Sequence, residues 1–215
     1  MVRAGAQIGD ALHGAVEGGH GEIVSDLLES GASLVAKDTN GRTPHHVTAE
    51  FGKTEMVQLL SLKGADKGAF TDDEWTPLSL AAYHGHMAAA LALLAAGADV
   101  SLRYGRLKSP VMHAAAENGH VEIVRALIEH AAGVDAVDIH QHTALHAAAR
   151  FNKIDVIHVL VVEARAKIEA RDRSGYTPLH HATGSLSREA TLCLLKHGAI
   201  VNAQDNVLQT PLHYA

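Results

Sequence analysis

The sequence repeats a short motif every 33 or 34 residues, and this period constrains the fold more than any other feature of the chain. Each copy centres on a histidine or serine, at His13, His46, Ser79, His113, His146, His180 and His213. The flanking segments align as well, for example TPLSLAAYHGH (76–86) with TPLHHATG (177–184). A unit of this length cannot bury its apolar face alone, so the copies are expected to stack against one another.

Each copy predicts two short helices and a loop. Thr177 is a good N-cap, and Pro178 fits the first helical position, where its missing N–H is harmless. The first helix is expected to end near a glycine such as Gly119, which favours a left-handed cap. A second helix follows with paired apolar residues, as in EIVRALIEHAA (122–132). A polar segment such as NAQDNVLQ (202–209) then leads to the next threonine.

These motifs resemble the ankyrin repeat family. The period, the Thr-Pro-Leu-His motif and the Gly-Ala ending of the second helix are typical of that family. The resemblance implies an all-α fold, a helical solenoid with short β-hairpin finger loops, containing six repeats and a truncated seventh in one domain over residues 1–215. We place the repeats at approximately 5–37, 38–70, 71–104, 105–137, 138–171, 172–204 and, in part, 205–215. Because TPLHYA (210–215) ends inside a first helix, we interpret the sequence as part of a longer chain.

Composition narrows the environment and the partners of the chain. With 47% apolar but only 4% aromatic residues, the core must consist mainly of Ala, Leu, Val and Ile. A net charge of −6 without a basic run argues against nucleic acid and anionic membranes as partners. The apolar run from Met87 to Ala98 is too short to cross a bilayer. The single Cys193 fits a reducing compartment, so we expect a protein of the cytoplasm or nucleus. We also expect a monomer without a cofactor.

The 17 histidines raise the question of a metal site. In HAAAENGH, His113 and His120 lie about 10 Å apart along a helix, too far to share one Zn²⁺. In the resembling family, the Thr-Pro-Leu-His histidine bonds to backbone groups and ties neighbouring repeats together. We interpret His140 and His142, in DIHQHTALH (138–146), as polar surface residues, and we predict no metal site.

Three repeats depart from the pattern. His45 occupies a slot that is usually a buried leucine, where we expect a neutral, hydrogen-bonded histidine. In the fourth repeat, KSPVMHAAA, the Ser-Pro pair lies one residue early. In the fifth, VVEARAKIEA (161–170) has Ala164 where glycine usually stands and one inserted residue, which predicts a less regular helix end. Asn202 occupies a finger position that asparaginyl hydroxylases modify in some resembling proteins, so it is a candidate for that modification.

The sequence favours surface recognition over catalysis. It contains no phosphate-binding GxxxxGK[ST], HExxH, GxSxG or CxxC pattern, so we predict a non-enzymatic module and no catalytic residues. The resemblance implies that a partner protein binds the concave face made by the fingers and first helices. Aromatic residues and arginine dominate binding energy in interfaces. The candidate contacts are Arg42, Trp75, Tyr83, Tyr104, His142, Arg150, Arg173 and Tyr176.

These positions predict an apolar anchor in repeat three and a more basic zone in repeats five and six. An acidic-aromatic peptide or protein surface fits such a face best, and Glu117 is expected to pair with Arg150. Two alternatives stay open. Trp75 could simply pack on its neighbouring finger, and the chain could be the regulatory ankyrin region of a larger enzyme, ubiquitin-ligase adaptor or channel whose other domain lies beyond residue 215.

Overall fold

The computed structural model describes residues 2–215, with side chains from Gly9 onward, and it is almost entirely helical. Its α-helices are α1 (Val2–Gly18), α2 (Gly21–Glu29), α3 (Pro44–Glu50), α4 (Thr54–Leu62), α5 (Pro77–His84), α6 (Met87–Ala95), α7 (Val111–Asn118), α8 (Val121–Glu129), α9 (Ala144–Arg150), α10 (Ile154–His158), α11 (Pro178–Gly184) and α12 (Arg188–Lys196). A π-helix (Val159–Glu163), a 3-10 helix (Pro211–Tyr214) and the two-residue strands β1 (Arg103–Tyr104) and β2 (Ser109–Pro110) complete the list. The predicted all-α repeat fold is confirmed.

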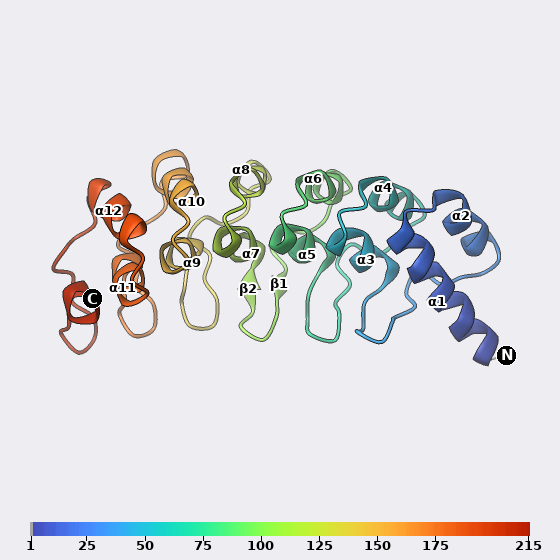
Figure 1. Cartoon of the computed structure of the whole chain (residues 1–215), viewed down its shortest axis with the longest axis horizontal. Helices are drawn as coiled ribbons and strands as arrows, with labels where there is room; N and C mark the ends of the chain where they lie inside the picture. Colours follow the sequence, from blue (N-terminus) through green and yellow to red (C-terminus); the bar gives the residue numbers. More distant parts are fainter. Residues whose placement is uncertain (1) are drawn as a thin grey trace. The chain divides into compact units, whose positions relative to one another are not determined.

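The chain forms two compact units, residues 1–106 and residues 107–215. The first unit contains α1 to α6 and the second contains α7 to α12. Within each unit, the first helices of successive repeats lie side by side in one row, the second helices form another row, and the finger loops project from the first-helix edge (Figure 1). The helix pair and the extended finger expected for each repeat are therefore present.

Alanines in the first helices allow the rows to pack closely. Ala81 and Ala82 in α5 are fully buried, as are Ala148 and Ala149 in α9. Larger side chains fill the space between first and second helices, and several of them have less than 2% of their surface exposed. These include Leu12, Leu60, Leu78, Leu93, Met112, Ile123, Leu127, Leu145, Ile157, Leu160, Leu179 and Leu194. The core is built from small and aliphatic residues, as the composition predicts.

Five histidines of the first helices bond to the finger of the next repeat, His13 from within α1 and the other four from near the starts of their helices. His46 illustrates the pattern: its Nδ1 accepts the backbone N–H of Thr43 (3.1 Å), and its Nε2 donates to the carbonyl oxygens of Ala69 and Trp75 (both 3.0 Å). This arrangement requires the neutral tautomer protonated at Nε2. Equivalent contacts join His13 to Arg42 O (2.8 Å), His113 to His142 O (2.8 Å), His146 to Tyr176 O (3.1 Å) and His180 to Gln209 O (3.3 Å). We refer to these five residues as the junction histidines.

The irregularities of repeats four and five appear as local changes of backbone. The inserted residue in repeat five is accommodated by the π-helix that follows α10, after which Arg165 takes a left-handed φ of +56°. The Ala166 N–H still reaches the Leu160 carbonyl (2.8 Å), so the chain leaves the helix toward the next finger. In repeat four, Pro110 rather than threonine is the N-cap of α7, which confirms that the Ser-Pro pair lies one residue early.

Replacing Ala131 with glycine should stabilise the protein by about 1 kcal/mol. Ala131 follows α8 with a φ of +61°, whereas Gly31, Gly64, Gly97 and Gly198 occupy this position elsewhere with φ of +91°, +88°, +85° and +90°. A left-handed conformation costs a residue with a Cβ about 1–2 kcal/mol, part of which glycine loses again through its freer unfolded state. Urea unfolding of the A131G variant measures the gain.

Gly64→Ala is the matched control for this prediction. A Cβ at Gly64 would meet no atom within 4 Å, so the substitution tests backbone conformation alone. We expect it to destabilise the protein by a similar amount. If A131G unfolds at or below the urea concentration that unfolds the parent, conformational strain at Ala131 is refuted.

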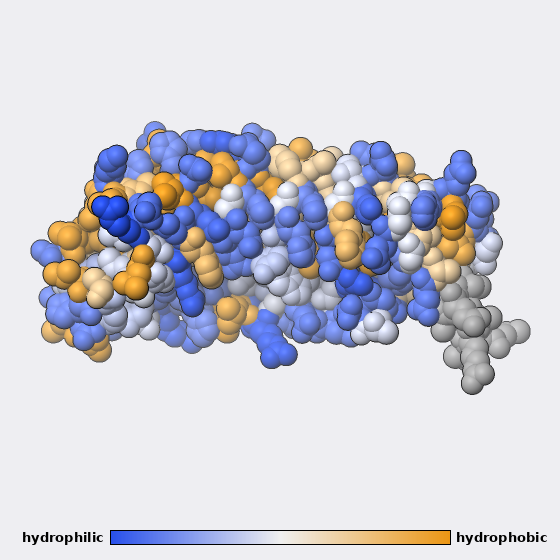
Figure 2. Space-filling model, in the orientation of Figure 1, coloured by the Kyte–Doolittle hydropathy of each residue, from blue (hydrophilic) through white to orange (hydrophobic). Residues whose placement is uncertain are grey.

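The surface mixes hydrophilic and hydrophobic side chains over most of the face shown in Figure 2. Hydrophobic residues gather around α12 and the residues after it, at the left of that view. Leu186, Leu192, Val207, Leu208 and Leu212 there are 50–79% exposed. Within the part of the chain that the structure describes, no helix combines the length and the apolar character needed to cross a bilayer.

Candidate binding surfaces

In the first unit, three predicted contact residues form one aromatic cluster. The Trp75 ring, on the finger before α5, lies 4.5 Å from the Tyr104 ring of the next finger. Tyr83, in α5, meets Trp75 edge-on, with 5.2 Å between ring centroids. Tyr104 is only 7% exposed, whereas Tyr83 is 38% exposed. Trp75 does pack on its neighbouring finger, and the same packing holds its half-buried ring beside an exposed tyrosine.

Arg42 lies on the preceding finger but is not a free cation. Its side chain is 18% exposed and forms ion pairs with Asp38 (2.7 Å) and Glu50 (2.6 Å). Burial alone would raise the pKa of Asp38, but hydrogen bonds from the Arg42 side chain and backbone outweigh burial and lower it. Arg42 therefore fixes its own finger against α3 more than it offers charge to a partner.

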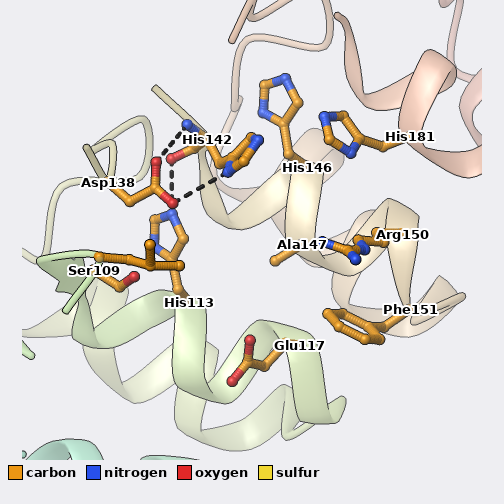
Figure 3. A pocket seen from close by; sticks show the side chains of 11 residues that line it. Ser109, His113, Glu117, Asp138, His142, His146, Ala147, Arg150, Phe151 and His181 are labelled. Carbon is orange, nitrogen blue, oxygen red and sulfur yellow. Dashed lines mark hydrogen bonds and ion pairs between the residues drawn. The ribbon is translucent and has the colours of Figure 1, made fainter. Parts of the chain in front are cut away.

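In the second unit, side chains from the fingers and from α7, α9 and α11 surround a cavity of about 90 Å³ (Figure 3). Two of the predicted contact residues, His142 and Arg150, line it. The other lining residues are Leu107, Ser109, His113, Glu117, Asp138, His146, Ala147, Phe151 and His181. The cavity joins charged, imidazole and aromatic groups that come from three successive repeats.

Carboxylates and imidazoles alternate beside this cavity, which Asp138, His142 and His181 line. His142 Nδ1 lies 3.1 Å from Asp138 Oδ2, and its Nε2 lies 3.3 Å from Asp172 Oδ2. The same Asp172 oxygen is 2.9 Å from His181 Nε2. Burial tends to raise the pKa of both carboxyl groups, but hydrogen bonds from backbone N–H groups and from the imidazoles, together with the imidazole charge, outweigh it and lower the pKa. Both aspartates are therefore ionised in this buried cluster.

The opposite wall of the cavity has a different character. The Arg150 guanidinium carbon lies 5.5 Å from the centre of the Phe151 ring, a cation–π distance. Glu117 lies across from them in Figure 3. Burial raises the pKa of Glu117, and the charge of Arg150 offsets part of that effect. The charge of Arg150 therefore acts on Glu117 from the adjacent repeat, and their direct pairing stays a prediction.

The two remaining predicted residues lie beside this cavity rather than in it. The Tyr176 ring packs edge-on against Tyr214, with centroids 5.2 Å apart, and lies 5.9 Å from the His181 ring. Arg173 is exposed on the finger, where its backbone N–H donates to the His140 carbonyl (2.9 Å). Tyr176 extends the surface around the cavity, and Arg173 lies on the finger outside it.

Sequence reasoning missed Asp172 and His181. Asp172 belongs to a finger position that looks structural in every repeat, because its Oδ1 accepts the backbone N–H groups of Ser174 and Tyr176 (2.8 and 2.9 Å). His181 directly follows a junction histidine, where the other first helices have Gly14, Val47, Leu80, Ala114, Ala147 and Tyr214. An imidazole at a repeat position that is otherwise mainly apolar was the signal by which His181 could have been found.

Comparisons with known proteins agree with the repeat architecture. A family model described as "Ankyrin repeats (3 copies)" matches residues 12–104 and 106–172, and one described as "Ankyrin repeat" matches residues 174–206. The chain is 28% identical to the "Transient receptor potential cation channel subfamily A member 1 homolog" of Caenorhabditis elegans, over 90% of this chain but only 16% of that protein. It is also 28% identical to the "Probable 26S proteasome regulatory subunit p28" of Saccharomyces cerevisiae, over 85% of this chain and 83% of that protein.

Among solved structures, the human ASB11 ankyrin repeat domain resembles this fold with a TM-score of 0.84. The two chains are 24% identical, and the match covers 95% of this chain and 90% of the other, so the likeness concerns the fold. The family models, by contrast, match the sequence itself over nearly its whole length. The chain belongs to the ankyrin repeat family.

Proposed function

We propose that this chain is a non-enzymatic protein-interaction module that binds a partner through its fingers and first helices. Ankyrin repeats are a general protein-interaction module, and the proposal adds the surface and the residues. The observation that supports it most is the pre-formed aromatic cluster of Trp75, Tyr83 and Tyr104. Rings already packed against each other lose little conformational freedom on binding, and such aromatics are typical hot spots.

The cavity in the second unit supplies the second contact zone of the proposal. Arg150 is exposed and pairs through its face with Phe151, so it can receive a carboxylate while the ring receives apolar atoms. His142 and Tyr176 lie near it along the same row of fingers. An acidic-aromatic peptide or protein surface has the matching chemistry for both zones, with an aromatic side chain for the first and a carboxylate for the second.

The test begins with a peptide library displayed on phage and panned against the intact chain, followed by titration of purified peptides. We expect enrichment of sequences with aromatic and acidic residues. W75A and Y83A should each weaken binding of such a peptide about thirtyfold, the effect typical of a hot spot. R150A should weaken binding of acidic peptides but not of their amide analogues.

Leu62→Ala is the matched control, because Leu62 is 87% exposed at the end of a second helix, outside both zones. It should bind as the parent does. Melting curves of every variant show whether the fold is kept. If W75A, Y83A and R150A all bind within about twofold of the parent while folded, the partner uses a different face.

A second candidate function is the regulatory region of a larger protein. The observation that favours it is the 16% share of the nematode channel homologue that this chain covers. The complete open reading frame of the gene decides between the two candidate functions, because an adjoining catalytic or membrane domain would support the regulatory role. A frame that encodes the repeats alone would favour the stand-alone module.

The proposal places the chain in the cytoplasm or nucleus as a monomer, and both points are measurable. The exposed apolar residues around α12 make self-association the competing outcome, since patches of this kind favour association. Light scattering coupled to size exclusion should give a mass near 22.7 kDa. Cell fractionation tests the compartment.

A further inference from the structure

His142 and His181, which line the second-unit cavity, converge with Asp172 of the finger before α11. Each of His142, Asp172 and His181 offers one atom, and the three atoms lie within 4.8 Å of one another. Figure 3 shows the ring of His146 between the rings of His142 and His181. The three come from two repeats: His142 from the finger before α9, Asp172 from the next finger, and His181 from α11. They occupy different positions of the repeat, so repetition of one motif does not place them.

Two of the three spacings between these atoms match a tetrahedral metal coordination sphere, and the third, between the two imidazole nitrogens, is within 4.8 Å. Ligands at 2.0–2.1 Å from a tetrahedral Zn²⁺ lie about 3.3 Å from each other. His142 Nε2 lies 3.3 Å and His181 Nε2 lies 2.9 Å from Asp172 Oδ2. An ion bound between them would need only small side-chain shifts. Two imidazoles and one carboxylate are a usual donor set for zinc sites with an open fourth position.

The hydrogen bonds around the three groups orient them for such an ion. His142 Nδ1 faces Asp138 Oδ2 at 3.1 Å, so a neutral His142 that donates there has its Nε2 lone pair directed at Asp172. In that tautomer, His142 Nε2 and Asp172 Oδ2 are both acceptors and lie 3.3 Å apart, so a proton or a cation must lie between them. Carboxylates that hold the far nitrogen of a ligating histidine are a general feature of zinc sites.

Asp172 is oriented in the same way. Its Oδ1 accepts two backbone N–H groups, which leaves Oδ2 directed at the two imidazoles. His146 lies 5.2 Å from the His181 ring but is not an available ligand, because its Nδ1 accepts the Thr143 N–H and its Nε2 donates to the Tyr176 carbonyl. Two buried anionic groups, Asp138 and Asp172, also favour a divalent cation at this place.

From these observations we infer that His142, Asp172 and His181 form a binding site for a divalent transition-metal ion, with Zn²⁺ the best match, and that Asp138 positions His142. Imidazole nitrogen selects zinc and its neighbours over Mg²⁺ and Ca²⁺, which prefer all-oxygen sites. The inference reverses the absence of a metal site predicted from the sequence, and it does not depend on the proposed partner.

The test uses the complete chain freed of any histidine tag, stripped with chelator and titrated with ZnCl₂ by calorimetry at pH 7.5. We expect one ion per chain and a higher melting temperature with Zn²⁺ than without it. Titration with Co²⁺ should produce the intense visible absorption of a tetrahedral site, whereas Mg²⁺ should give no heat.

Two variants remove a ligand while keeping the fold. His181→Ala places alanine where Ala114 and Ala147 already stand in α7 and α9, and Asp172→Asn keeps an Oδ1 acceptor for the finger. Each should lower the affinity for Zn²⁺ at least tenfold, and Asp138→Asn about 10- to 100-fold. His197→Ala is the matched control, because His158 and His197 are also neighbours, with rings 5.6 Å apart, but have no place in the site.

The inference is supported if H181A and D172N, folded by circular dichroism and with cooperative melting, lose the ion while H197A binds as the parent does. It is overturned if the parent shows no saturable heat and no Co²⁺ spectrum. It is also overturned if H181A binds Zn²⁺ as tightly as the parent, since the ion would then lie on other histidines and the cluster would be joined by protons alone.

Discussion

Replacing His46 with serine should lower the free energy of unfolding by about 2–3 kcal/mol and loosen the finger that contains Trp75. The His46 ring is fully buried and donates to the Ala69 and Trp75 carbonyls. Serine keeps the local bond, as Ser79 shows in the next repeat, where its Oγ accepts the Thr76 N–H (2.9 Å). It is too short to reach the next finger, so two carbonyl bonds are lost and a cavity forms.

Urea unfolding followed by circular dichroism measures this loss, and fluorescence reports where it acts. Trp75 is the only tryptophan in the sequence, so its emission follows the finger that His46 holds. The matched control is Ser79→Ala, which removes only a local capping contact and should cost about 1 kcal/mol. A loss in H46S no larger than that in S79A, with unchanged emission, would show that the junction bonds contribute little.

The second large effect is expected at His45, where leucine should stabilise the protein, and increasingly so at acidic pH. His45 has none of its surface exposed, and its Nδ1 has no hydrogen-bond partner among the described residues. Its Nε2 lies 3.3 Å from Ser61 Oγ. Burial, the largest cause, lowers the pKa of His45 to about 4. Removing a buried unpaired nitrogen should gain about 1 kcal/mol even at pH 7.5.

The pH dependence follows from the two pKa values of His45. The folded value of about 4 lies below the unfolded value of about 6.5, so the unfolded state binds more protons between them. The pH-dependent part of the penalty of His45 is absent above about pH 6.5 and grows as pH falls. It reaches about 1.4 kcal/mol at pH 5.5 and is complete below about pH 4 at roughly 3 kcal/mol.

Urea unfolding of the parent and of H45L at pH 7.5 and 5.5 tests this expectation. The difference between the two proteins should widen by about 1.4 kcal/mol between these pH values. Buried histidines that do not act on His45, such as His146, titrate in both proteins and cancel in the difference. A gap that stays constant with pH would mean that His45 is not kept neutral by burial.

The fold could be predicted from the sequence because the same pattern recurs in several repeats and predicts the same helix pair each time. Thr177, Pro178 and the junction histidines specify helix starts by local chemistry, and their regular spacing implies stacking. The insertion before Ala164 predicted an irregular helix end, but its form as a π-helix depends on how Val159 and Leu160 pack. Tertiary contacts decide the form of this helix end, and the spacing of residues in the sequence does not reveal them.

The candidate site was less accessible to sequence reasoning. Residues that vary between repeats could be identified, and they include Trp75, Tyr83 and Arg150. The surroundings of the predicted side chains could not be identified in this way. The sequence does not show that two carboxylates neutralise Arg42 or that Tyr104 is buried against Trp75. The His142–Asp172–His181 cluster depends on residues 30 and 39 positions apart in different slots of the repeat, so only the geometry of adjacent repeats brings them together.

The π-helix after α10 has a consequence for how this chain tolerates changes in length. His146 and His180 are 34 residues apart, and His13 and His46 are 33 apart, yet all four make the same bond to the following finger. The extra residue is absorbed within five residues of backbone and is not passed on to α11. Since each repeat contacts only its neighbours, an insertion needs no compensating deletion elsewhere. Repeats of unequal length can therefore accumulate along the array while the row of fingers stays in register.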